Sequence, residues 1–160
     1  LGKLSAAKPK VASYPFTTLQ PVVGVLEFPG YRRCTVADIP GLIEGAHENR
    51  GLGHEFLRHI TRCRMLLFVV DMAGSEARDP VSDLEILRRE IREYDEELAR
   101  FPWKVVANKM DLEGAAEHLA NFRQRFPKVE VIPISAEGGE GMDDLRRMLD
   151  SEVATHPNEK

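Results

Sequence analysis

The 160-residue chain has only two cysteines, Cys34 and Cys63, and no long hydrophobic run. Two cysteines without metal-ligand spacing exclude a disulfide framework and a thiolate zinc site, and they fit a reducing compartment. The longest apolar stretch, residues 65–70, is too short to cross a bilayer and predicts a buried strand. The formal net charge of −4 argues against nonspecific affinity for nucleic acid. The short apolar run predicts that the chain has no membrane span. We also expect no sequence-specific binding to DNA.

The residues that are present, 42% hydrophobic and 30% charged, fit one globular domain with its own core. Hydrophobic periodicity predicts strands over 22–28, 33–38, 65–71, 104–107 and 129–134, and helices over 55–62, 115–126 and 142–153. A further long helix is predicted by apolar residues recurring from Val81 to Leu98. The first two strands flank the turn Pro29-Gly30 and predict an antiparallel hairpin. This order indicates an α/β fold, a mostly parallel sheet with one antiparallel hairpin strand and helices on both faces.

The segment Asn108-Lys109-Met110-Asp111 directly follows an apolar strand and is predicted to recognise guanine. The Asp111 carboxylate can accept hydrogen bonds from both N1–H and the exocyclic amino group of guanine, whereas adenine has no donor at these positions. Adenine would leave this acceptor unpaired, at a cost of about 1–3 kcal/mol. Asn108 is expected to tie the loop to neighbouring segments, and the Lys109 stem is expected to lie along the base.

A second apolar strand, residues 131–134, ends in Ser135-Ala136. One helix fits between this strand and the guanine-reading segment, so the two loops are expected at the same edge of the sheet. The Ala136 backbone N–H is then predicted to donate to guanine O6. Ser135 and Ala136 therefore join the candidate nucleotide-binding residues.

Polar residues nearer the N-terminus are candidates for binding the phosphates and a metal ion. The predicted strand that contains Cys34 ends in Asp38, and Gly41 follows three residues later. We expect Asp38 to hold Mg²⁺ through water and the Gly41 N–H to contact a γ-phosphate. Thr17 and Thr18 supply two loop hydroxyls, and one of them is expected to be a ligand of the same metal.

With these residues in this order, the chain resembles the Obg family of translation-factor-related GTPases. The segments that carry the resemblance are 14–19, 38–46, 51–53 and 56–60. The resemblance extends from Ser5 to about Val153, and it implies a P-loop NTPase-type G domain over residues 1–154 followed by a polar tail, residues 155–160. The family's first strand and phosphate-binding loop would end just before Leu1. We therefore expect this chain to lack that loop and a central strand, and to bind GTP weakly or not at all by itself.

The resemblance also implies an activity, ligands and a partner. It implies GTP and GDP as ligands, Mg²⁺ as cofactor, and Thr18, the second of the two threonines, as its ligand. Leu42 stands where many small GTPases carry a glutamine that orients the attacking water. The resemblance therefore implies slow intrinsic hydrolysis of GTP, with the water positioned by another group, by a monovalent cation such as K⁺, or by a partner. The intact protein is expected to act on the ribosome, in large-subunit assembly. The expected location is the bacterial cytoplasm or, alternatively, a mitochondrial or plastid matrix.

Two other classes of function stay open at this point. One is a degenerate G domain that acts as a non-catalytic protein-interaction module. The other is an α/β enzyme that binds a dinucleotide or a nucleotide sugar. The latter requires a glycine-rich loop after a first strand and an acidic ribose contact further on, and neither is visible in this sequence.

Overall fold

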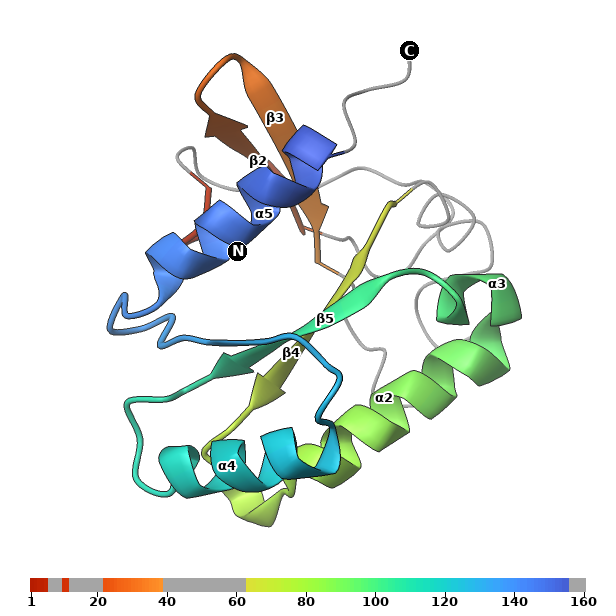
Figure 1. The fold of residues 1–160 in the computed structure, drawn as a ribbon, viewed down its shortest axis with the longest axis vertical. Coiled ribbons are helices and arrows are strands. Elements are labelled where there is room, and N and C mark those ends of the chain that lie inside the picture. Colours follow the sequence, from red (N-terminus) through yellow and green to blue (C-terminus); the bar gives the residue numbers. More distant parts are fainter. Residues whose placement is uncertain (6–9, 12–21, 39–62, 156–160) are drawn as a thin grey trace.

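The computed structural model describes residues 1–5, 10–11, 22–38 and 63–155 (Figure 1). In chain order the elements are β1 (Lys10–Val11), β2 (Val22–Phe28), β3 (Arg32–Ala37), β4 (Leu66–Asp71), the short 3-10 helix η2 (Ser75–Ala77), α2 (Pro80–Tyr94), α3 (Glu96–Ala99), β5 (Trp103–Asn108), α4 (Ala115–Arg125), β6 (Val131–Pro133) and α5 (Met142–Thr155). The helix predicted over 55–62 lies outside the described residues. None of the helices found within these ranges is long and apolar enough to cross a membrane.

The strands form two sheets within the described residues. Strands β4, β5 and β6 make a parallel sheet in that order, while β1, β2 and β3 make an antiparallel sheet. The predicted hairpin is confirmed as β2 and β3, and its turn uses positive φ angles of 78° at Gly30 and 60° at Tyr31. The α/β arrangement is therefore confirmed. Within the described residues, the hairpin strands β2 and β3 pair with each other and with β1, and they belong to a different sheet from β4, β5 and β6.

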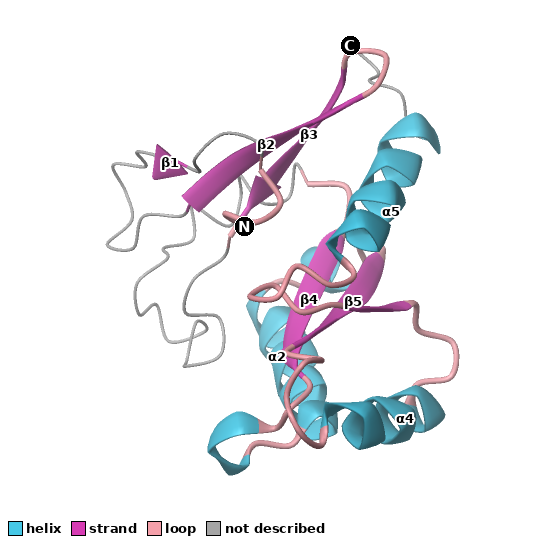
Figure 2. Cartoon of the chain, turned by 90° about the vertical axis from the view of Figure 1, so that its left-hand side faces the viewer, coloured by secondary structure: helices cyan, strands magenta, loops and turns pink. Residues whose placement is uncertain are grey.

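Helices cover both faces of the parallel sheet, as predicted. Because side chains alternate along a strand, Phe68 and Val105 face one core with α2, α3 and α4, while Val106 faces a second core with α5 and the hairpin. Figure 1 shows α5 and α2 on opposite sides of β4 and β5, and Figure 2 shows the hairpin beside α5. The parallel sheet is thus the middle layer of the molecule.

The prediction of one long helix through Leu98 is wrong, because the helix is interrupted at Asp95. Residue Asp95 has extended backbone angles, φ −154° and ψ 114°, and separates α2 from α3. Its carboxylate accepts hydrogen bonds from the backbone N–H groups of Glu97 (2.8 Å) and Leu98 (3.4 Å). An aspartate in this role starts a new helix. Leu98 nevertheless reaches the core, where it is 1% exposed.

Charged side chains join α5 to both sheets. Arg32 at the start of β3 donates to Asp150 of α5, with an Nη2–Oδ1 distance of 2.6 Å. On β5, Lys104 lies 2.6 Å from both Glu130 and Glu152, the latter a residue of α5. Arg146 of α5 also donates to the backbone carbonyl of Leu4. These contacts fix α5 across the hairpin and the parallel sheet.

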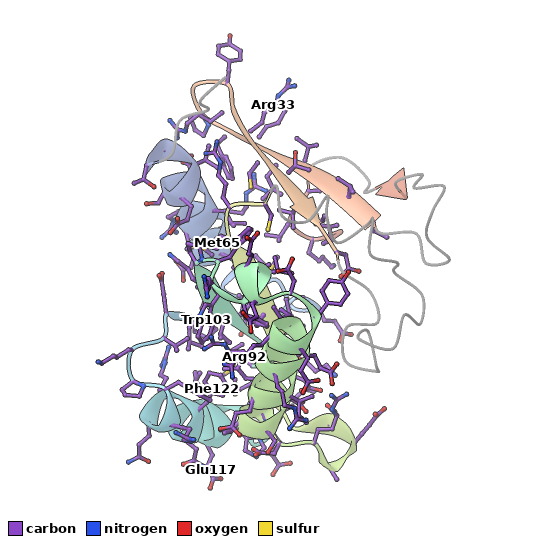
Figure 3. The ribbon with its side chains drawn as sticks, turned by 90° about the vertical axis from the view of Figure 1, so that its right-hand side faces the viewer. Arg33, Met65, Arg92, Trp103, Glu117 and Phe122 are labelled. Carbon is purple, nitrogen blue, oxygen red and sulfur yellow. The ribbon has the colours of Figure 1, made fainter. Side chains whose placement is uncertain are left out.

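Phe122 is the largest fully buried side chain in the described core, and Figure 3 shows it between α4 and the sheet. We predict that Phe122→Ala lowers the free energy of unfolding by about 3–5 kcal/mol, because it removes buried surface and leaves a cavity. Tyr31→Ala is the matched control, since Tyr31 is fully exposed, and it should change stability by less than about 0.5 kcal/mol. Urea unfolding measures both, and equal losses would contradict the packing described here.

Candidate nucleotide site

The candidate site lies at the carboxyl edge of the parallel sheet. In the pairing of β4 with β5, Asp71 is opposite Asn108, the last residue of β5. In the pairing of β5 with β6, Ala107 is opposite Pro133. The loops that follow these strands therefore begin side by side, at the edge where ligands of open α/β sheets bind. Asn108, Lys109, Asp111, Ser135 and Ala136 all belong to this edge.

The side chain of Asn108 joins the loop after β5 to the loop after β6. Its Oδ1 atom accepts a hydrogen bond from the backbone N–H of Ala136 at 3.1 Å. The backbone N–H of Met110 also donates to the carbonyl of Ile134, at 3.1 Å. The predicted tie between Asn108 and a neighbouring segment is thus present. Because the Ala136 N–H has this protein partner here, its donation to guanine O6 stays a prediction.

Ser135 organises the second loop from within. It is fully buried, and its Oγ accepts from the backbone N–H of Gly138 at 3.0 Å. Its backbone N–H donates to the carbonyl of Glu140 and its carbonyl accepts from Gly139, both at 2.8 Å. With all these groups engaged, Ser135 holds the position of Ala136 and has little surface of its own to offer a ligand.

Asp111 differs from Asp71, the other aspartate of this edge, because it is exposed and unengaged. Within the part of the chain that the structure describes, its carboxylate forms no hydrogen bond and no ion pair. The turn that carries it is closed by a hydrogen bond from the N–H of Leu112 to the carbonyl of Lys109, at 3.1 Å. The carboxylate is therefore open to an incoming donor pair such as the N1–H and amino group of guanine.

Lys109 extends sideways from the loop to the end of the neighbouring strand. Its Nζ atom lies 2.8 Å from Oδ2 of Asp71 and 3.4 Å from Oγ of Ser75. Burial alone would raise the pKa of Asp71, but hydrogen bonds from Lys109 and Ser75 and the lysine's charge outweigh it and lower that pKa. The hydrogen bond to Asp71 raises the pKa of Lys109 in turn. Both shifts favour the ion pair.

The sequence-based prediction missed Asp71 and Ser75. The available signal was the position of Asp71, which ends a buried apolar strand as Asn108 does. Ligand-binding residues of such sheets gather at strand ends. Its partner, in contrast, is 38 positions further along the chain, and no local pattern connects the two residues.

The predicted phosphate and metal residues lie mostly outside the described residues. This applies to Thr17, Thr18, Gly41 and Leu42. Asp38 is described: it is exposed, follows β3, and its backbone N–H donates to the carbonyl of Val22 at 2.8 Å. Among the described residues, no group of three or more histidine, cysteine or acidic side chains is placed to hold a metal. A Mg²⁺ ion bound partly by water and phosphates does not require such a group.

Comparison with known proteins gives the class. Residues 1–109 match a family model described as 50S ribosome-binding GTPase. In a structure of Era from Aquifex aeolicus bound to GDP and AlF4⁻, the match has a TM-score of 0.66 at 24% identity and covers 99% of this chain and 52% of that chain. For the G domain of the T. maritima FeoB iron transporter the TM-score is 0.64 at 18% identity, over 95% of this chain and 87% of that chain. These identities show the fold alone, and that fold is the predicted GTPase G domain.

Curated relatives give the family. The chain is 71% identical over 153 residues to GTPase Obg of Akkermansia muciniphila and 50% identical over 150 residues to GTPase Obg of Opitutus terrae. The alignments cover 96% and 91% of this chain but 44% and 43% of those relatives, so the chain spans less than half of their length. The chain belongs to the Obg family of GTPases, as its motifs predicted.

The loop that holds Ala136 depends on a glycine at its end. Gly141 has φ +74°, and a Cβ atom there would lie 2.2 Å from the carbonyl oxygen of Pro133. Gly139 has a similar φ, +85°, but open space around its Cβ position. We predict that Gly139→Ala costs only the left-handed backbone conformation, about 1–2 kcal/mol, and that Gly141→Ala costs clearly more. Urea unfolding of the two variants measures the difference, and equal losses would show that the Pro133 contact relaxes freely.

The Asp71–Lys109 ion pair has a predictable acid dependence. Because the folded-state pKa of Asp71 lies below the ordinary value of 3.8, its stabilising contribution is complete above that value and is lost as the pH falls through the lowered pKa. Carboxyl-carbon NMR should give a midpoint below 3.8 for Asp71. Lys109→Met should raise this midpoint, whereas Lys104→Met, at the other end of β5, should leave it unchanged. A midpoint insensitive to Lys109→Met would contradict the pair.

Proposed function

We propose that this chain is the guanine-nucleotide-binding part of an Obg-type GTPase that hydrolyses GTP to GDP in the full-length protein. The observation that carries the proposal is the contrast between two side chains of the same loop. The amide of Asn108 is engaged with Ala136 and fixes the loop, while the carboxylate of Asp111 is exposed and unengaged. A fixed loop that presents a free bidentate acceptor is what selective recognition of guanine requires.

The phosphate end of the proposed site would be formed by residues nearer the N-terminus. Asp38 and Thr18 would hold Mg²⁺, Asp38 through water, and the Gly41 N–H would contact the γ-phosphate, with Thr17 beside it. The exposed carboxylate of Asp38 fits this role, since carboxylate oxygen and water are the ligands that Mg²⁺ prefers. The ion neutralises the charge that develops on the phosphates during hydrolysis.

Hydrolysis is proposed to be slow without an additional group. The alkyl side chain of Leu42 cannot orient a water molecule, so another residue, a K⁺ ion or a macromolecular partner would have to position it.

The proposed partner is the ribosome, and the proposed process is assembly of the large subunit in the bacterial cytoplasm. The description of the matching family, 50S ribosome-binding GTPase, supports this partner. So does Era, which has been solved in complex with MgGDPNP and a segment of 16S ribosomal RNA and matches this chain at a TM-score of 0.64 and 25% identity. The bacterial origin of both Obg relatives supports the location.

Asp111→Asn tests guanine recognition. An asparagine can donate to the 2-oxo group of xanthine but cannot accept from both donors of guanine. In the full-length protein, we expect the wild type to bind fluorescent GDP and the variant to lose at least about tenfold in GDP affinity while gaining affinity for xanthosine diphosphate. Glu113→Gln is the matched control, because it neutralises an exposed carboxylate two residues further along the same turn, and it should leave the preference unchanged.

Either of two results would overturn the proposal. If the full-length wild type binds neither GDP nor GTP, the chain is better explained as a non-catalytic interaction module with a G-domain fold. If it binds guanine nucleotides and Asp111→Asn keeps the same preference, Asp111 is not the group that recognises the base.

A further inference from the structure

The ammonium group of Lys109 is held at a defined point by groups from outside its own loop. It lies 2.8 Å from Asp71 at the end of β4 and 3.4 Å from Ser75 in η2. Asp71 is opposite Asn108 in the β4–β5 register, so the ion pair bridges two neighbouring strands at their carboxyl ends. Adjacent strands are about 4.8 Å apart, a distance that a lysine stem can span. The four methylene groups of Lys109 therefore run across the edge of the sheet.

Asp71 is itself held in place. Its Oδ1 atom accepts a hydrogen bond from the backbone N–H of Ala73 at 3.0 Å, while Oδ2 accepts from Lys109. The Asp71 side chain is 22% exposed, against 44% for that of Lys109. One oxygen bound to the backbone fixes the direction in which the other points. The carboxylate is therefore an oriented anchor, and the lysine is the longer and more exposed partner that it holds.

The direction of the Lys109 stem matters because the proposed base contact is made by the stem. A lysine side chain has about 2 kcal/mol of rotamer entropy, and without an anchor this freedom must be lost when the ligand binds. An anchor that already exists in the free protein removes that cost. The Asp71 carboxylate supplies such an anchor without occupying Asp111, which stays free to recognise the base.

We infer that Asp71 is a positioning residue for guanine binding: through its ion pair with Lys109 it holds the lysine stem in the place where the base must lie. This inference rests on the proposed function. It assigns separate tasks to the two aspartates at this edge. Asp111 selects the base by its hydrogen-bonding pattern, whereas Asp71 raises the affinity for any purine that lies on the lysine stem.

Asp71→Asn in the full-length protein tests the inference. The asparagine keeps the size of the side chain and removes its charge. We expect about a three- to tenfold loss of affinity for GDP, the effect of leaving one long side chain to be ordered by the ligand. Inosine diphosphate, which lacks the 2-amino group, should lose the same factor, so the ratio between the two nucleotides should stay at the wild-type value. A merely structural disturbance of the Asp111 loop would change that ratio.

Glu130→Gln is the matched control. It neutralises one carboxylate of another lysine–carboxylate contact, that of Lys104 on the same strand β5, at the end away from the guanine-reading loop. It should leave the affinities for both nucleotides unchanged. The thermal unfolding midpoint of each variant without nucleotide shows whether the fold is retained.

A double-mutant cycle with Lys109→Met shows whether Asp71 acts through the lysine. Methionine keeps an unbranched stem without the charge, and Lys109→Met alone should lower GDP affinity by a similar factor. In that background Asp71→Asn should have no further effect. The Lys109→Met measurement also keeps the test valid if Asp71→Asn does not fold, because an unchanged GDP affinity in Lys109→Met would overturn the inference.

The possible failures are distinguishable. If the wild type does not bind GDP, the proposed function fails and the inference with it. If the wild type binds GDP but folded Asp71→Asn binds equally well, the inference fails and the proposed function stands. If Asp71→Asn loses the same factor with methionine at position 109, Asp71 acts independently of the lysine and the inference also fails.

Discussion

The parallel pairing of β4 with β5 is the constraint on which the candidate site depends. It aligns the two strand ends so that Asp71 lies opposite Asn108, and it thereby brings Lys109 within 2.8 Å of a carboxylate on the next strand. A shift of one residue would turn the side chains of a strand to the opposite face of the sheet. The burial of Phe68 and Val70 opposes such a shift, because it would remove both side chains from the core that they form with α2, α3 and α4. The packing of the core thus also fixes which side chains meet at the carboxyl edge of the sheet.

Helix α5 connects the parallel sheet to the antiparallel sheet. In the described part of the chain no strand pairing joins the antiparallel sheet to the parallel one. The two sheets share a core under α5, to which β2 contributes Leu26 and β5 contributes Val106. Ion pairs of α5 also reach both sheets: Asp150 contacts Arg32 of β3, and Glu152 contacts Lys104 of β5. Since Asp38 follows β3, the contacts of α5 help to set its position relative to the loops after β5 and β6. A change in the packing of α5 would therefore displace Asp38 relative to these loops.

The parts of the molecule that sequence predicted are those encoded locally. Strand β5 and the segment after it followed from an apolar run and the chemistry of Asp111, and both are where they were expected. Strand β6 is shorter than the predicted 129–134, and the long helix is divided at Asp95, where a capping carboxylate overrides an apolar periodicity that continues to Leu98. The partnership of Asp71 with Lys109 was not predictable from either segment, because it arises only when two strands pair.

The backbone conformation of Lys109 is one that favours glycine, yet the chain has a lysine at this position. Its φ is +64°, a left-handed conformation in which a Cβ atom is unfavourable and which glycine would adopt at lower cost. Contacts of the side chain can offset such a cost. In the free protein Lys109 does so through its contacts with Asp71 and Ser75. The strain, the ion pair and the free carboxylate of Asp111 thus occur within one turn, which is the arrangement expected of a loop formed in advance for its ligand.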